Sequence, residues 1–369
     1  MRRRARSAAP RRRRRTRPDG GTPRRTSSIV RHSILLASEF SIGRSRRGVV
    51  GWIHPNRGRS TVGEDRTATM REAVSAHVRD GDVVALEGFT HLIPVAAGHE
   101  IIRQGRRDLT LVRMTADIVF DQMLAAGVAR KLVSSFVGNS AVGSLHELRR
   151  RVEHADPEPL ELEEYSHYGL LGRYLAGAQG LPFYPLRSYA GSDLPRVNPN
   201  IRTVRSPFDD GTTVHAVPPL NPDVAILHAQ RADAAGNTQV WGMLGGQQEV
   251  AFAARKVVVV VEEVVAPEVI RSDPNRTLIP EFVVDAVVEC PRGAHPSYVQ
   301  GYYERDGAFY RAWPEISRDP ERLRQWLDEW VHDLADHSEY LAKLGDAHWD
   351  ELIPKSALSA PVDYGAARD

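Results

Sequence analysis

Carboxylates that follow short apolar runs are the side chains of this 369-residue chain best placed for chemistry. Glu87 ends the apolar run 83–86, and Glu262 and Glu263 end the valine run 257–261. A carboxylate at the end of a buried strand can act as a nucleophile or as a general base when its surroundings shift its pKa. The competing interpretation is that it orients a loop or caps a helix. We favour that structural role for Glu262 and Glu263.

Small and polar residues gather in two further turns. Asp233, Gly236 and Asn237 follow the apolar run that ends near residue 228, while Gly293 and His295 follow the run 282–288. Glycine lets backbone amides approach a bound group closely, where they can stabilise developing negative charge. Asn237 can donate to a bound carbonyl or hold a left-handed turn, and the sequence leaves both roles open.

The turn 138–143 places Asn139 and Ser140 between two glycines. It is one residue longer than the G-x-S-x-G elbow that presents a hydrolytic serine. A glycine-rich connection between a strand and a helix is therefore the better interpretation.

Several other chemistries lack their motifs. There is no G-x-x-x-x-G-K-[ST] loop and no strand-linked G-x-G-x-x-G, and His99-Glu100 is followed by Arg103 where a zincin needs a second histidine. The single cysteine, Cys290, permits neither an internal disulfide nor a cysteine zinc cluster, which favours a cytoplasmic protein. The fourteen histidines are scattered along the chain, so we expect no metal site.

Alternating helical and extended patterns must position these residues. Helical spacing begins at Met70 and continues to residue 78, and it recurs over 94–102 and 117–127. The extended runs are 83–86, 109–112, 131–136, 223–228, 256–261 and 282–288. The valine run is too short for a membrane span and too continuous for a strand with one wet face. The fold class predicted is α/β, with an open, mainly parallel sheet covered by helices on both faces.

The C-terminal region predicts one long amphipathic helix. Asp319 suits the N-cap, Pro320 the first helical position and Gly345 the stop. One stripe carries the apolar side chains, which we interpret as core in preference to a subunit contact: Leu323, Trp326, Leu327, Trp330, Leu334, Leu341 and Leu344.

Charge divides the chain into two parts. Residues 1–60 hold 18 arginines and only two acids, whereas residues 61–369 hold 31 basic and 45 acidic residues. We expect a disordered leader over 1–66, a single domain over 67–350 and a loose tail over 351–369. The leader can bind nucleic acid, act as a transit peptide or reflect a misassigned start codon with translation beginning near Met70. We favour the misassigned start, and the acidic body argues against nucleic acid as a partner.

Four segments together resemble one family. They are the run 80–89 with Pro94 after it, the turn 232–237, the stretch 253–265 and the turn 291–296. In order and spacing they are similar to the α (A) subunits of family I coenzyme A transferases of the glutaconate type. They also resemble related hydrolases that open ring-derived acyl thioesters. Glu87 departs from the pattern, since it stands where a glycine is common.

The resemblance implies a subunit that works with a β-type partner, in an α2β2 assembly. In such enzymes a glutamate of the β-type partner attacks an acyl-CoA and later carries coenzyme A as a glutamyl thioester. Coenzyme A is then a substrate, and no cofactor is bound permanently. For this chain we consider a catalytic role for Glu87, with a turn carboxylate as the alternative. The expected substrate-binding and CoA-binding residues are Gly88, Phe89, Thr90, Asn139, Ser140, Asp233, Gly236, Asn237, Glu262, Glu263, Gly293 and His295.

The acyl group and the acceptor stay open at this stage. A dicarboxylic or 3-oxo acid needs cationic or hydroxyl partners, for which Arg113, Ser140 and Tyr165 are candidates. The alternatives to a transferase are a subunit of an acyl-CoA hydrolase acting on ring-cleavage products, a nucleic-acid-associated protein and a lone metabolite-binding protein. The sequence contains no apolar stretch long enough to cross a membrane, so we expect no membrane partner.

Overall fold

The computed structural model describes residues 63–139 and 142–354. Most of the predicted leader 1–66, the candidate Ser140 and most of the tail 351–369 lie outside these residues. The boundaries of the three expected segments therefore stay predictions. No helix in the described part of the chain is both long and apolar enough to cross a membrane.

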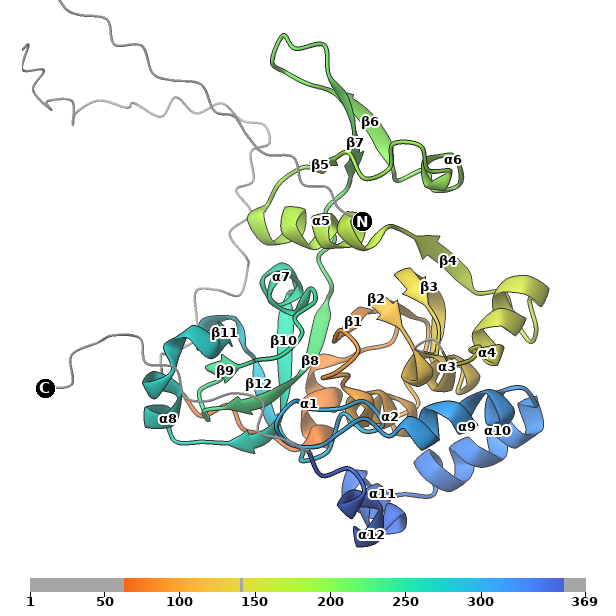
Figure 1. The fold of residues 1–369 in the computed structure, drawn as a ribbon, viewed down its shortest axis with the longest axis vertical. Helices are drawn as coiled ribbons and strands as arrows, with labels where there is room; N and C mark the ends of the chain where they lie inside the picture. The colour runs from red at the N-terminus through yellow and green to blue at the C-terminus, as the bar shows by residue number, and fades with distance from the viewer. Residues whose placement is uncertain (1–62, 140–141, 355–369) are drawn as a thin grey trace, which may run out of the picture. The chain divides into compact units, whose positions relative to one another are not determined.

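Seven parallel strands form the centre of the main sheet, in the order β12-β10-β8-β1-β2-β3-β4. The order reverses beside β1: the chain first builds outward on one side and then returns to build from β8 on the other (Figure 1). The parallel strands are β1 (Val83–Glu87), β2 (Leu109–Ala116), β3 (Ala129–Val137), β4 (Glu161–Glu164), β8 (Val224–Ala232), β10 (Lys256–Val264) and β12 (Ala286–Glu289).

Helices cover both faces of this sheet, as the valine run predicts. Val258 and Val260 belong to one apolar cluster and Val257, Val259 and Val261 to the other, because successive side chains of a strand point to opposite faces. The first face packs against α1 (Met70–His77), α2 (Val95–Arg103), α3 (Ile118–Ala125), α9 (Gly307–Ser317) and α10 (Pro320–Leu327). The second packs against α5 (His167–Gln179) and α7 (Gln247–Ala253) (Figure 1).

Two β features extend beyond the predicted pattern. Strands β9 (Thr238–Gln239) and β11 (Thr277–Ile279) prolong the sheet in antiparallel pairing from the end of β8. A separate antiparallel sheet has the order β5-β7-β6, with β5 Tyr184–Leu186, β6 Arg202–Arg205 and β7 Thr213–Val217. It projects beyond α5 in Figure 1. The short remaining elements are α4 (His146–Arg149), η1 (Arg150–His154), α6 (Leu194–Val197), α8 (Pro267–Ser272), η2 (Pro274–Arg276) and η3 (Glu281–Val283).

The predicted strand 282–288 is too long at its start. Glu281–Val283 forms a 3-10 turn, and β12 begins only at Ala286. Pro280 supplies the turn with its carbonyl, which accepts the Val283 amide, and the Asn237 side chain accepts the Glu281 amide at 3.1 Å. Local hydrogen bonds thus replace strand pairing over these residues.

The predicted long C-terminal helix is broken. Asp319 caps α10 and Pro320 opens it as expected, but α10 passes into a π-helical turn, η4 (Asp328–His332). A new helix, α11 (His337–Leu344), begins at its own N-cap, Asp336, and ends at Gly345, after which α12 (Asp346–Asp350) follows. The break divides the apolar stripe. Leu323, Trp326 and Leu327 pack in the first cluster, as the core interpretation requires, whereas Leu341 and Leu344 pack against the second.

A buried carboxylate joins α9 to the body of the domain. Asp121, on α3, accepts the Leu148 amide and the Trp313 indole N–H, each at 2.9 Å. Burial raises the pKa of Asp121 to about 7, from 3.8. The folded chain therefore keeps a proton that the unfolded chain releases between these values, and the contribution of Asp121 to stability falls as the pH rises through that window.

Trp313→Phe removes the indole donor and should lower the free energy of unfolding by about 1–3 kcal/mol. The loss should be larger at about pH 8.5 than at about pH 5.5, because a charged Asp121 depends more on its donors than a protonated one. Chemical unfolding at both pH values measures this. Trp326→Phe is the control. The ring centroid of Trp326 lies 5.1 Å from that of Trp313, and this variant should show no such pH dependence. Equal losses at both pH values in the Trp313 variant would contradict the prediction.

Candidate site at the carboxyl edge of the sheet

The carboxyl end of β1, beside β8, lies where the strand order reverses, which is where open α/β sheets bind their ligands. Glu87 is the last residue of β1 and lies level with Leu227 of β8. The turn Gly88–Leu92 follows at once, and it needs a glycine: a side chain at Gly88 would stand 2.4 Å from the Leu92 carbonyl oxygen. The sequence-predicted residues Glu87, Gly88, Phe89 and Thr90 therefore lie together at this edge.

Glu87 is held inside the edge. Its carboxylate, 2% exposed, accepts the Tyr174 hydroxyl at 2.8 Å and the Met114 amide at 2.9 Å. Burial raises the pKa of Glu87, while the nearby Arg113 guanidinium acts in the opposite direction. These contacts tie β1 to β2 and to α5. They direct the carboxylate toward its own chain.

Arg113, on the neighbouring strand β2, holds the turn Gly88–Leu92 in place. Its guanidinium is fully buried, donates to the Gly88 carbonyl at 2.9 Å and pairs with Asp117 at 3.0 Å. The sequence makes it a candidate for binding an acidic substrate, and the structure instead uses it within the fold. Tyr165, the other described candidate for that role, is also buried and donates to Glu163.

Loops from three parts of the chain cover the edge. His91 stacks on Tyr298 with ring centroids 4.8 Å apart, and its Nε2 lies 2.6 Å from the Met243 carbonyl. Gly242 belongs to the same cover, since a side chain there would stand 2.8 Å from the His91 ring. Phe89 meets His167 of α5 edge to face at 6.0 Å. Thr90 adopts a left-handed backbone conformation, with φ of 61°.

A second carboxylate cluster occupies the next strand pair. Glu262, on β10, lies 2.6 Å from His228 Nε2 and accepts the Arg292 amide at 2.6 Å and the Tyr303 hydroxyl at 3.2 Å. Gly293 is required beside this cluster, because a side chain there would meet the Cys290 carbonyl oxygen at 2.8 Å and the His228 ring at 3.2 Å. Glu263 accepts the Tyr302 hydroxyl, and burial together with this contact raises the pKa of Tyr302.

Two histidines that no sequence motif selects lie in this region. Nδ1 of His91 and Nδ1 of His228 are buried and have no hydrogen-bond partner among residues 63–139 and 142–354. Burial lowers the pKa of His91, which favours its neutral form. His91 follows a predicted strand and His228 lies in another. The sequence nevertheless contains no motif that distinguishes these two histidines from the other twelve.

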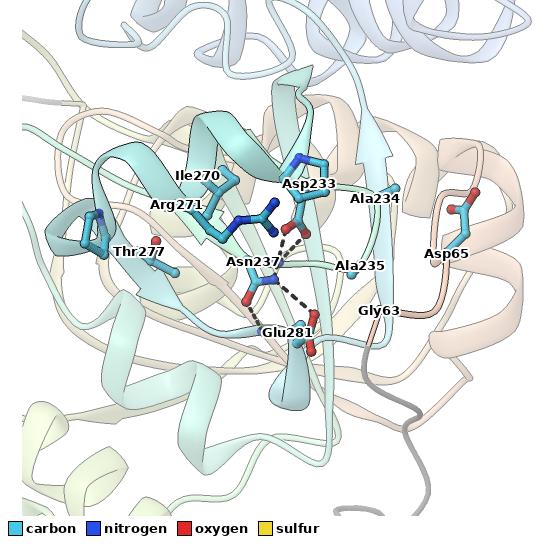
Figure 2. Close-up of a pocket in the computed structure, with 12 residues that line it drawn as sticks. Gly63, Asp65, Asp233, Ala234, Ala235, Asn237, Ile270, Arg271, Thr277 and Glu281 are labelled. Carbon is cyan, nitrogen blue, oxygen red and sulfur yellow. Dashed lines mark hydrogen bonds between the residues drawn. The ribbon is translucent and has the colours of Figure 1, made fainter. Parts of the chain in front are cut away.

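Asp233, Gly236 and Asn237 form a separate turn farther along β8. β8 continues from Leu227 to its end at Ala232, and Asp233 follows, so this turn lies roughly 20 Å from the level of Glu87. Asp233 accepts the amides of Gly236 and Asn237, both at 2.9 Å. The Asn237 side chain donates to Asp233 and to Glu281, as Figure 2 shows. Asn237 thus makes contacts within the turn, while the left-handed backbone conformation belongs to Gly236, with φ of 106°.

A cavity of about 540 Å³ lies against this turn (Figure 2). Carboxylates of Asp65, Asp233 and Glu281 and the guanidinium of Arg271 are among its lining groups. Among the described lining residues, three acids outnumber one cation, a balance that does not suit the phosphates of a nucleotide.

The remaining predicted residues are used within the fold. Asn139 is buried and donates to the Tyr310 carbonyl of α9 at 2.7 Å. His295 is buried as well, and its ring contacts Tyr340, Asp306 and His348. Within the described residues, His295, Asp306 and His348 are the only group of side chains whose spacing suits a metal ion.

Comparison with known proteins agrees with this architecture. The family model described as coenzyme A transferase matches residues 67–290. The A subunit of the 3-oxoadipate CoA-transferase of Pseudomonas knackmussii is 53% identical over 278 residues, covering 75% of this chain and 98% of the relative. The cholesterol ring-cleaving hydrolase IpdA subunit of Rhodococcus jostii is 29% identical over 290 residues, covering 76% and 96%.

The glutaconate CoA-transferase of Acidaminococcus fermentans provides both a sequence and a structural match. Its A subunit is 36% identical over 314 residues, covering 81% of this chain and 98% of the relative. Its crystal structure superposes with a TM-score of 0.73 at 35% identity, covering 78% of this chain and 95% of that one. The resemblance of the four sequence segments is thus confirmed by the fold and by full-length relatives. The chain belongs to the coenzyme A transferase family, as an A-type subunit of a transferase.

Proposed function

We propose that this chain is the A subunit of a two-subunit enzyme that transfers coenzyme A to a short dicarboxylic acid of the 3-oxoadipate class. The observation that carries the proposal is the 53% identity to the A subunit of a 3-oxoadipate CoA-transferase, along 98% of that relative. The carboxyl edge supports it, since the tightly packed glycine turn after β1 lies where open α/β sheets bind their ligands.

The chemistry follows from covalent catalysis by a glutamate of the partner subunit. That carboxylate attacks the thioester carbonyl, which forms an acyl-glutamyl anhydride and releases the CoA thiolate. The thiolate attacks the glutamyl carbonyl, which gives a glutamyl-CoA thioester and the free donor acid. The acceptor carboxylate then attacks this thioester, and the steps run in reverse to give the new acyl-CoA and the free glutamate.

In this scheme the A subunit supplies one wall of the pocket. The turn Gly88–Leu92 is fixed by Arg113 and by the Glu87 contacts, so its backbone is held rigidly. A rigid wall costs little reorganisation when charge develops on the thioester oxygen. Glu87 acts as a positioning residue, because both of its contacts are internal.

A hydrolase subunit is the second candidate. It is favoured by the likeness to the ring-cleaving hydrolase subunit, at 29% identity over 76% of this chain. The two reactions differ in what attacks the thioester at the end: a carboxylate acceptor in a transferase and water in a hydrolase. We rank hydrolysis second because the identity to the transferase subunit is higher, at 53%.

Co-expression with a β-type CoA-transferase subunit tests the proposal. The purified complex should move CoA from succinyl-CoA to 3-oxoadipate, detected as the new acyl-CoA by chromatography. This chain alone should show no transfer. Free thiol, measured with a thiol reagent in the absence of acceptor, reports hydrolysis. Rapid thiol release without acceptor would favour the hydrolase, and neither reaction on any short dicarboxylic thioester would overturn the proposal.

Glu87→Gln in that complex tests the positioning role. Glutamine keeps a carbonyl oxygen for Tyr174 and Met114, so kcat should fall by less than about tenfold. Glu87→Ala leaves both donors unsatisfied inside the edge and should lower the free energy of unfolding by about 1–3 kcal/mol. Mass spectrometry of the complex with acyl-CoA and no acceptor should find the CoA adduct on the partner. An adduct on the peptide that contains Glu87, or loss of all turnover in the glutamine variant, would show that Glu87 is catalytic.

A further inference from the structure

Three metal-binding side chains meet where the C-terminal helices join the body of the domain. His295 comes from the turn after β12, Asp306 from the N-cap of α9 and His348 from α12. Their separations in sequence, 11 and 42 residues, match no metal motif. For that reason the sequence predicts no metal site.

The three ligand atoms form a nearly equilateral triangle. His295 Nε2 lies 3.1 Å from Asp306 Oδ2 and 3.2 Å from His348 Nε2, and His348 Nε2 lies 3.2 Å from the same Oδ2. Bonds of about 2.0–2.2 Å to one metal ion place neighbouring ligand atoms roughly 3.3–3.6 Å apart in a tetrahedron and roughly 2.8–3.1 Å apart in an octahedron. The triangle lies between these two sizes, so small side-chain movements let its three atoms bind a single ion.

Each of the two buried ligands is oriented by a further contact. Nδ1 of His295 is 2.8 Å from the Tyr340 hydroxyl, which leaves Nε2 for the triangle. Asp306 uses Oδ1 to accept the Phe309 amide at 2.8 Å, as the cap of α9, and so presents Oδ2. Outer contacts of this kind fix ring orientation and ligand direction in metal sites.

The triangle also has an entrance. The side chain of His348 is 26% exposed, whereas those of His295 and Asp306 are 0% and 5% exposed. An ion can enter past His348, and a water molecule can complete its coordination from that side. Aromatic rings enclose the other sides, with Trp349 5.1 Å and Phe309 5.7 Å from the His295 ring.

We propose that His295, Asp306 and His348 bind one divalent transition-metal ion, with Zn²⁺ as the best fit. Two imidazoles and one carboxylate suit zinc and its neighbours, whereas Mg²⁺ and Ca²⁺ prefer sets of oxygen ligands. The ion joins α12 to the β12–α9 connection. Its effect is on the attachment of the C-terminal helices, since the cluster uses none of the side chains at Glu87 or Glu262.

The test uses the full-length chain, stripped with a chelator and then dialysed against Zn²⁺. The wild type should retain one more zinc ion per chain than His348→Ala does. Affinity for that ion should fall by about tenfold or more in His348→Ala and in Asp306→Asn. Asparagine at position 306 keeps an oxygen that can cap α9. Asp306→Asn should therefore stay folded and test the proposal even if His348→Ala does not fold. Co²⁺ in place of zinc should give a visible absorption band in the wild type and not in His348→Ala.

His332→Ala is the matched control, since this exposed histidine of the same C-terminal region lies outside the triangle. It should bind zinc like the wild type. Zinc should also raise the melting temperature of the wild type and of the control, and not that of His348→Ala. Equal zinc content in the wild type and His348→Ala would overturn the proposal, because any zinc bound elsewhere on the chain is unaffected by that substitution. A preference for Mg²⁺ over Zn²⁺ would overturn the assignment of the metal class.

Discussion

The burial of the Arg113–Asp117 ion pair beside the buried Glu87 is the constraint on which the carboxyl edge depends. A buried charge that loses its partner costs several kcal/mol, and a buried donor left without its acceptor costs about 1–3 kcal/mol. The contacts of Arg113 and Glu87, to Asp117, the Gly88 carbonyl, the Met114 amide and Tyr174, must therefore persist together. As a result β1, β2, α3 and α5 hold the Gly88 turn at one position. A ligand meets a surface that is already formed.

Much of the fold was predictable, because burial on both faces of a strand leaves a strong signal. The valine run 257–261 can exist in water only between two layers of helices, and the two apolar clusters divide it in that way. The small sheet β5-β7-β6 has no such signal, since its strands are short and few of their residues are fully buried. The break in the C-terminal helix depends on the Asp336 cap. The helical spacing of apolar residues continues across Asp336, so the sequence pattern alone does not reveal the break.

Less of the candidate site could be read from the sequence, although strand ends identified its place. Glu87 and Glu262 were correctly expected at the carboxyl edge, because parallel strands end on the same side. What each side chain contacts depends on residues far away in the chain. Tyr174, 87 residues from Glu87, decides that this carboxylate faces inward. The Asn237 side chain likewise donates to Glu281, 44 residues later.

The use of carboxylates within this chain bears on the division of labour between subunits. Glu87, Glu262 and Glu263 each accept hydrogen bonds from their own chain. A carboxylate that already stabilises buried donors is a poor nucleophile, since attack on a thioester would require it to leave them unsatisfied. The candidate acids of the described site therefore shape and hold the edge. A glutamate supplied by a second chain does not have to satisfy these buried donors. This supports our proposal that the A subunit contributes the wall of the pocket and its partner contributes the attacking group.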